Sequence, residues 1–243
     1  MRTFRICRTD EAVITMNYAE FQNIIKVSKL ELYHSTFSDN KENIRIKNEK
    51  TALKNLEKIF CAALKISNRK GWYNMSMRDL SRETDLSMGA LYAYFSSKED
   101  LLGMLLRQGR NLVRQVLEER IASVKGAEDM LRMIIRTHLY LSEIMQPWFY
   151  FSYMETKNLS DEERKNAIDS ELSTETMIRD ILELGEAEGI FQPRNHQLSA
   201  GIIKAMLQEW YVRRWKYAKR NVTVDQYADF ILEFIESFYS SPA

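Results

Sequence analysis

The sequence is poor in residues that turn the backbone. Its 243 residues include only eight glycines and three prolines, and Pro147 is the first proline. Strands joined by hairpins need more of both residue types, whereas long helices do not. With 45% hydrophobic and 28% charged residues, the chain is long enough to bury a sizeable core. The composition excludes a disordered or fibrous protein and favours an all-α fold.

Cysteine and histidine are also scarce. The two cysteines, Cys7 and Cys61, cannot build a disulfide framework and lack metal-ligand spacing. Cys61 lies in an apolar run and is predicted to be a small core residue. Because the three histidines, His34, His138 and His196, are far apart in the sequence, we expect neither a metal site nor a cofactor.

Long hydrophobic runs and catalytic motifs are missing as well. No run of about 18 uncharged apolar residues is present, which argues against a membrane span. Asp10 and Glu11 interrupt the N-terminal region where a secretory signal would be apolar. The chain has no Gly-rich phosphate loop, no GxSxG and no HExxH motif. We therefore expect a cytoplasmic protein that has no membrane partner and is not an enzyme.

Residues 1–48 carry the weakest signal. Apolar residues between Tyr18 and Tyr33 follow helical spacing, and the polar residues 38–42 after them are typical of a linker. This extension could be a functional arm, the product of a start codon upstream of Met16, or a partly ordered tail. The sequence leaves these three alternatives open.

A helix-turn-helix pattern follows from Thr51 onward. One helical stripe of apolar residues runs to Gly71, which is a suitable residue to end a helix. Ser76 and Asp79 form a carboxylate variant of the capping box, which predicts a short helix ending near Thr84. After a turn at Asp85 and Leu86, Ser87 is suited to cap a second short helix that runs to about Tyr94. Two short helices joined by about three residues are typical of a helix-turn-helix.

Longer helices are predicted for the rest of the chain. Capping residues, Pro147 and the glycines at 185 and 189 support these boundaries. The expected spans are 97–124, 127–145, 148–157, 161–189, 196–219 and 224–240. The last span carries an aromatic stripe wide enough to bury completely, either on its own domain or on a second copy of the chain.

The second short helix has the features of a DNA recognition helix. Small residues at its first turn, Ser87, Gly89 and Ala90, would let that end approach bases closely. Leu91 and Phe95 are expected to point inward. The phenols of Tyr92 and Tyr94 can donate to phosphate oxygens, and Lys98 joins its charge to free amides at the start of the next helix. Arg78 and Arg82 share a face of the preceding helix. Any one of these residues alone more often marks a solvated helix surface, so the prediction depends on their combination.

The segment Gly89-Ala-Leu-Tyr-Ala-Tyr-Phe-Ser-Ser-Lys98-Glu-Asp-Leu-Leu102, within Thr51–Leu102, closely resembles the DNA-binding domain of TetR-type (TetR/AcrR) transcriptional regulators. The resemblance implies an all-helical homodimer with a helix-turn-helix domain at 49–97 and an effector-binding and dimerisation domain at 98–243. It places base contacts around the first turn and phosphate contacts just after it. The implied DNA-binding residues are Arg78, Ser87, Met88, Gly89, Ala90, Tyr92, Tyr94 and Lys98. One departure is Asp85, where the family usually has glycine; aspartate tolerates the left-handed conformation better than most residues.

The C-terminal half offers candidates for an effector pocket and a dimer interface. A nearly continuous aromatic segment could line a pocket for a large, mainly apolar effector, or it could be plain core. Its residues are Trp148, Phe149, Phe151, Tyr153 and Met154. The last two helices would pair with those of a second chain. The candidate anchors there are Trp210, Tyr211, Phe230, Phe234 and Phe238.

The chemistry of the effector stays open at this stage. Glu143 and Glu155 would suit a cationic hydrophobic drug, and a basic cluster would suit an anionic ligand. That cluster is Arg213, Arg214, Lys216, Lys219 and Arg220. The segment 208–217 is similar to family members that respond to fatty acyl-CoA, although a basic, solvated helix end is the simpler explanation.

The net charge of +1 is small for a DNA-binding protein. The balances of residues 1–48, 49–100 and 101–243 are +2, +2 and −3, so affinity would depend on where individual charges point. We expect a ligand-responsive DNA-binding regulator, a repressor that leaves its operator when an apolar small molecule binds. The alternative is a helical adaptor or scaffold without DNA binding.

Overall fold

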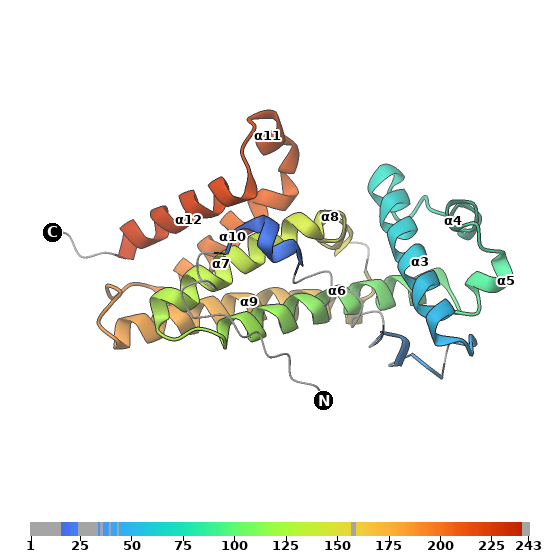
Figure 1. The fold of residues 1–243 in the computed structure, drawn as a ribbon, viewed down its shortest axis with the longest axis horizontal. Coiled ribbons are helices and arrows are strands. Elements are labelled where there is room, and N and C mark those ends of the chain that lie inside the picture. Colours follow the sequence, from blue (N-terminus) through green and yellow to red (C-terminus); the bar gives the residue numbers. More distant parts are fainter. Residues whose placement is uncertain are drawn as a thin grey trace. The chain divides into compact units, whose positions relative to one another are not determined.

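The computed structural model describes residues 16–23, 34, 36–38, 40–42, 44–156 and 159–239. Within these residues the regular secondary structure is entirely helical (Figure 1), which confirms the all-α prediction. The helices are α3 Glu49–Lys70, α4 Met77–Thr84, α5 Met88–Leu91, α6 Lys98–Ile121, α7 Ala127–Ile144, α8 Gln146–Glu155, α9 Asp161–Ala187, α10 His196–Val212, α11 Arg214–Lys219 and α12 Val224–Tyr239. Residues 18–23 are also helical. The rest of the predicted helix 18–33 and Cys7 lie outside the described residues.

Local signals set the helix boundaries of the helix-turn-helix. The capping box of α4 is present, since the Asp79 amide donates to Ser76 Oγ at 3.2 Å and the Ser76 amide donates back to Asp79 Oδ2 at 2.9 Å. Asp85 adopts the left-handed conformation (φ 55°), and Ser87 Oγ caps α5 by accepting from the Ala90 amide at 3.1 Å. The helix that was expected to reach Tyr94 ends at Leu91, and a turn follows it.

The predicted helix 196–219 is broken in two at Arg213. The break brings Tyr217 of α11 against Trp210 of α10, with ring centroids 5.2 Å apart, and both rings pack on Tyr227 of α12. The carboxylate of Glu209 binds both Arg213 and Lys216 across the break. The end of α10 is therefore set by side-chain contacts, which cannot be predicted from helical periodicity.

The chain divides into two compact units. Of the described residues, unit 1 contains 16–23, 113–144 and 170–239, and unit 2 contains those from 34 to 112 and from 145 to 169. Helices α6 and α9 contribute residues to both units. This division does not follow the functional domains expected from the sequence, because the first half of α6 and all of α8 pack with residues 49–97.

Each unit has its own apolar core. In unit 2, α4 and α8 pack on α3, and α5 follows α4 (Figure 1); Leu56, Ile59 and Leu80 are fully buried there. In unit 1, α7 packs against α10 and α12, and Ile134 and Trp210 are fully buried.

Cys61 is exposed rather than buried. It lies off the buried stripe of α3, which passes through Leu56, Ile59, Phe60, Ala63 and Ile66. Among the described residues no helix is long and apolar enough to cross a membrane.

Candidate nucleic-acid interface

The helix-turn-helix is assembled on α3 by buried anchors and side-chain hydrogen bonds. Leu91 is fully buried and Phe95 is 2% exposed, which confirms the two inward anchors. Ser81 Oγ of α4 donates to the Leu86 carbonyl at 2.6 Å, so the turn between the helices is tied to α4. Lys58 of α3 donates to the Thr84 carbonyl at the end of α4 at 2.8 Å. These contacts fix the position of α5 within unit 2.

The first turn of α5 presents an open surface. Ser87 and Gly89 are exposed, while Met88 and Ala90 are half-buried. A methyl group added at Gly89 would meet no atom within 4 Å. The open first turn therefore leaves room for the edge of a base pair in the major groove.

The two tyrosines after α5 point in different directions. Tyr92 is 44% exposed, as a phosphate-binding residue requires, but Tyr94 is fully buried. The Tyr94 hydroxyl accepts a hydrogen bond from Asn55 Nδ2 of α3 at 3.0 Å, and burial raises the pKa of this phenol. The structure corrects the expected phosphate contact of Tyr94, because the turn after α5 directs its side chain into the core.

Lys98 lies at the start of α6 beside the loop that follows α3. Its Nζ donates to the Tyr73 carbonyl at 3.1 Å and lies 5.3 Å from the centre of the Trp72 ring. Partial burial lowers the pKa of this ammonium group, although Glu99 and Glu155 oppose the shift. Lys98 is half-buried, so it keeps access to solvent.

Sequence reasoning missed Tyr73, whose side chain is 88% exposed. The Lys98 ammonium lies 6.0 Å from the centre of the Tyr73 ring and 5.3 Å from the centre of the buried Trp72 ring. The sequence signal that could have identified Tyr73 was the aromatic pair Trp72-Tyr73, which directly follows Gly71 at the end of α3.

The arginines of α4 differ in their surroundings. Arg82 is bound to Asp79 at 2.6 Å, and Asp79 also binds Lys70 and Ser76, which together hold the pKa of its carboxyl far below the usual range. Arg78 is exposed, and among the described residues no ion pair within 4 Å involves it. Arg78 is therefore the α4 arginine available to a ligand.

The aromatic helix α8 packs into unit 2. Trp148, Phe149 and Phe151 are buried, whereas Tyr153 and Met154 are 48% and 41% exposed. The Trp148 indole donates to the Leu105 carbonyl of α6 at 3.1 Å, and Phe151 packs on Trp72 with ring centroids 5.6 Å apart. The buried residues of α8 are therefore part of a packed core, and Tyr153 and Met154 are exposed beside it.

The candidate interface residues separate into two groups. Trp210 and Tyr211 are buried in unit 1, whereas Phe230, Phe234 and Phe238 are 65%, 56% and 48% exposed. The three phenylalanines recur every four residues and form one stripe on α12. The aromatic face of α12 was predicted to bury completely, but in one chain only its other residues are buried, among them Tyr227, Ile231 and Ile235.

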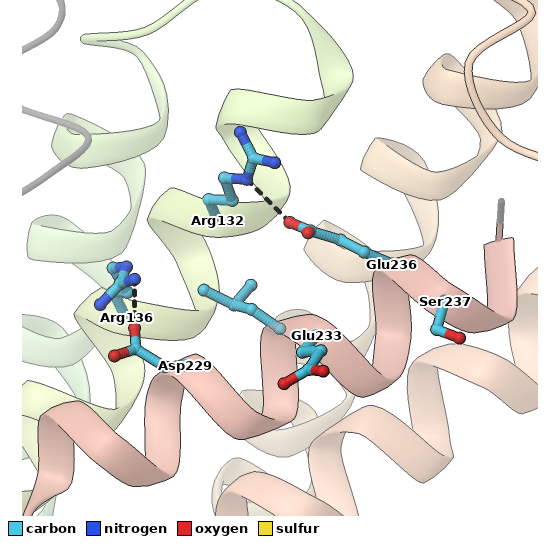
Figure 2. A pocket seen from close by; sticks show the side chains of 7 residues that line it. Arg132, Arg136, Asp229, Glu233, Glu236 and Ser237 are labelled. Carbon is cyan, nitrogen blue, oxygen red and sulfur yellow. Dashed lines mark hydrogen bonds and ion pairs between the residues drawn. The ribbon is translucent and has the colours of Figure 1, made fainter.

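An open groove of about 410 Å³ lies between α7 and α12 (Figure 2). Arg136 pairs with Asp229 at 2.5 Å and Arg132 pairs with Glu236 at 2.7 Å along its wall. Figure 2 shows these charged side chains crossing from one helix to the other. All but one of its lining residues are charged or polar, so the groove does not match a large apolar effector.

Several of the charged groups considered for an effector have protein partners. Arg214 pairs with Glu143 at 2.7 Å, and the Trp210 indole donates to the same carboxylate at 3.0 Å. Glu155 accepts from the Trp72 amide at 3.4 Å. Neither carboxylate is therefore available to a cationic drug without breaking these contacts. In the described part of the chain, no group of three or more His, Cys, Asp and Glu side chains could hold a metal ion.

A lysine side chain is buried inside unit 1. Lys204 Nζ of α10 lies 3.0 Å from His138 Nε2 of α7, and both residues are buried. Burial lowers the pKa of Lys204 to about 8, although Glu171 and Glu175 oppose the shift. Burial and the nearby Lys204 charge lower the pKa of His138 well below its usual value.

Fold and site together define an all-helical protein with a helix-turn-helix. A family model described as "Bacterial regulatory proteins, tetR family" matches residues 59–105, and one described as "Tetracyclin repressor-like, C-terminal domain" matches residues 124–235. The chain therefore belongs to the TetR family, and it is a transcriptional regulator with a DNA-binding helix-turn-helix.

Individual relatives are distant. The HTH-type transcriptional regulator HbdR of Aromatoleum sp. (strain CIB) is 23% identical over 183 residues, 75% of this chain and 80% of the relative. The crystal structure of AibR in complex with isovaleryl coenzyme A and operator DNA has a TM-score of 0.66 at 18% identity, covering 74% of this chain and 97% of that one. FadR from Bacillus subtilis in complex with stearoyl-CoA has a TM-score of 0.62 at 19% identity, with 74% and 97% covered. At these identities the two structures support the fold.

Proposed function

We propose that this TetR-family chain acts as a homodimeric repressor that binds operator DNA through α4 and α5. The observation that carries the proposal is the open first turn of α5, held on α3 by the buried anchors Leu91 and Phe95. Ser87, Met88, Gly89 and Ala90 would face base edges, and Arg78 would add a contact from α4. Tyr92 and Lys98 would bind phosphates. A helical scaffold without DNA binding would leave these features without a role.

The dimer would form through the exposed stripe of Phe230, Phe234 and Phe238 on α12. Large exposed apolar residues in a row mark an interaction surface, and symmetric pairing would bury the same stripe from both chains. Trp210 and Tyr211 would then support the interface from inside unit 1. Such a dimer would place two recognition helices about 34–36 Å apart, to match successive major grooves.

For the effector we propose an acyl-CoA, because AibR and FadR are solved with isovaleryl coenzyme A and stearoyl-CoA, respectively. A ligand that favours a dimer geometry unsuited to successive major grooves would weaken operator binding by its differential affinity for the two states. Tyr153 and Met154 are the members of the aromatic segment that keep exposed area. They would contact the acyl chain at the edge of α8, while Trp148, Phe149 and Phe151 would support this edge.

Fluorescence anisotropy tests the function directly. Fragments of the source genome are selected with the full chain, and the most enriched one is titrated without ligand, with isovaleryl-CoA and with stearoyl-CoA. We expect specific binding and at least tenfold weaker affinity with one of the two esters. Failure to enrich any fragment would contradict DNA binding. Specific binding that neither ester changes would contradict only the acyl-CoA assignment.

A further inference from the structure

Tyr73 lies on the short loop that joins α3 to α4 (Figure 1). Its side chain is 88% exposed, whereas the preceding Trp72 is buried and packs on Phe151 with ring centroids 5.6 Å apart. The Trp72 amide donates to Glu155 Oε1 at 3.4 Å, and the Trp72 carbonyl accepts from the Met75 amide at 3.0 Å. The backbone directly before Tyr73 is therefore fixed to the core of unit 2.

The Tyr73 backbone also binds Lys98, the first residue of α6. Lys98 Nζ donates to the Tyr73 carbonyl at 3.1 Å and lies 6.0 Å from the centre of the Tyr73 ring. Asn74, the next residue, donates from Nδ2 to the Lys70 carbonyl at the end of α3 at 2.9 Å. Contacts on both sides of Tyr73 thus hold its backbone, while its ring stays in solvent beside a cation. A side chain presented from a fixed backbone loses little backbone entropy when it binds a partner.

The DNA backbone is the partner that this position favours. Tyr73 lies three residues before Ser76, which caps α4, the helix that carries Arg78. The Lys98 ammonium has three donor hydrogens, so it can keep the Tyr73 carbonyl and still bind a phosphate. Successive phosphates of one strand advance by only about 3.4 Å along the duplex axis. A strand whose phosphate binds Lys98 therefore passes the Tyr73 phenol, and tyrosine is among the side chains that donate to DNA phosphates.

We propose that the Tyr73 hydroxyl donates to a phosphate of the operator segment that Lys98 binds, so that the α3–α4 loop adds a contact beyond α4 and α5. This inference rests on the proposed DNA-binding function and extends its interface. The contact is uncharged on the protein side. It strengthens binding to every DNA sequence, but it releases no counterion and leaves the salt dependence of binding unchanged.

Substitution Tyr73→Phe tests the contact in the full chain, because it removes only the hydroxyl and keeps the carbonyl that binds Lys98. Anisotropy titrations at several salt concentrations use the selected operator fragment and an unrelated fragment. We expect about fivefold or greater loss of affinity for both fragments, since the dimer loses one hydrogen bond to a charged group from each chain, and an unchanged salt slope. Tyr73→Ala should bind at least as weakly. Tyr150→Phe, which removes the hydroxyl of a half-buried tyrosine of α8 in the same unit, is the matched control and should bind like the original chain.

Methylphosphonate substitution of single operator phosphates locates the contact. Replacing the phosphate that Tyr73 binds removes the charged acceptor, so this change should weaken binding by the original chain. The same replacement should cost Tyr73→Phe less, at one phosphate in each half-site, because the variant has already lost the hydrogen bond. An equal cost for both chains at every phosphate would overturn the proposal.

Equal affinity of Tyr73→Phe and the original chain would also overturn it, even if Tyr73→Ala binds more weakly, because the ring and not the hydroxyl would then be the contact. A shallower salt slope in Tyr73→Phe would overturn it as well, since the substitution would then act by displacing Lys98. These results leave the proposed function intact, because the original chain still binds its operator. If the original chain enriches no fragment, the proposed function fails and the Tyr73 contact fails with it.

Discussion

The Lys98 ammonium lies 5.3 Å from the centre of the Trp72 ring and donates to the neighbouring Tyr73 carbonyl. This arrangement holds the lysine at the edge of the helix-turn-helix before any DNA is present. A positioned cation loses less side-chain entropy when it meets a phosphate than a freely rotating one. The exposed rings of Tyr73 and Tyr92 belong to unit 2, as Lys98 does.

Lys98→Ala should weaken binding to every DNA sequence by a similar factor, because phosphate contacts carry no sequence information. Because the dimer loses one phosphate contact from each chain, the slope of log affinity against log salt concentration should become shallower by about 1.8. Anisotropy titrations at several salt concentrations provide the measurement. Lys125→Ala, an exposed lysine of unit 1, is the control and should keep the slope. An unchanged slope for Lys98→Ala would remove this residue from the interface.

Arg78→Ala should change sequence preference rather than general affinity. An arginine that contacts a guanine edge contributes about 1–3 kcal/mol of discrimination at one base pair. Arg82→Ala, one turn further along α4, is the matched control because Arg82 is already bound to Asp79. Selection of binding sites with each variant should show relaxed preference at one position only for Arg78→Ala. Equal preference in both variants would contradict a base contact by Arg78.

Local chemistry made much of this region predictable. Ser76, Asp85 and Ser87 set helix ends through contacts within a few residues, and all three behave as the sequence indicates. Tyr94 and Cys61 were misassigned because burial depends on partners distant in the sequence, such as Asn55 for Tyr94. The docking of Tyr18 on Asp225 joins positions 207 residues apart. Helical periodicity has no information about such pairs.

The Gly109 site on α6 should tolerate no side chain. A methyl group there would lie 2.0 Å from the Trp148 ring, so Gly109→Ala should overpack the contact between α6 and α8 and lower stability by about 1–3 kcal/mol. Gly89→Ala is the control, since it meets no neighbour and should leave stability unchanged or raise it by up to about 1 kcal/mol. Chemical denaturation measures both. Equal stability of the two variants would contradict the packing of α8 on α6.

Phe234→Asp should dissociate the dimer without unfolding the chain, because Phe234 is 56% exposed in the single chain. Placing a carboxylate in a buried interface leaves it unpaired, at a cost of several kcal/mol. Sedimentation at micromolar concentration should show a monomer. Leu172→Asp changes a similarly exposed apolar residue of α9 and should remain dimeric. Dimers of unchanged stability in Phe234→Asp would exclude the α12 stripe as the interface.

Lys204 should make stability depend on pH in alkaline solution. Burial lowers its pKa from 10.5 to about 8, so between these values the unfolded chain binds more protons than the folded one and stability rises with pH. The cost of the buried charge is about 3 kcal/mol at pH 7 and smaller by about 2 kcal/mol at pH 9.5.

Substitution Lys204→Met removes this cost, offset in part by loss of the contact with His138. The difference in unfolding free energy between Lys204→Met and the original chain should therefore shrink by about 2 kcal/mol from pH 7 to pH 9.5. Denaturant titrations at both pH values measure it. The exposed Lys219→Met should show no such change. A difference independent of pH would mean that Lys204 titrates normally.

The central claim is sequence-specific DNA binding through α4 and α5. Its most direct measurement is footprinting of the full chain on the fragment that it enriches from the source genome. We expect a protected site with two-fold symmetry and half-sites about 10–10.5 base pairs apart, or a multiple of that spacing. Protection should be lost in a variant that combines Arg78→Ala with Lys98→Ala. No protected site, or the same footprint with this double variant, would contradict it.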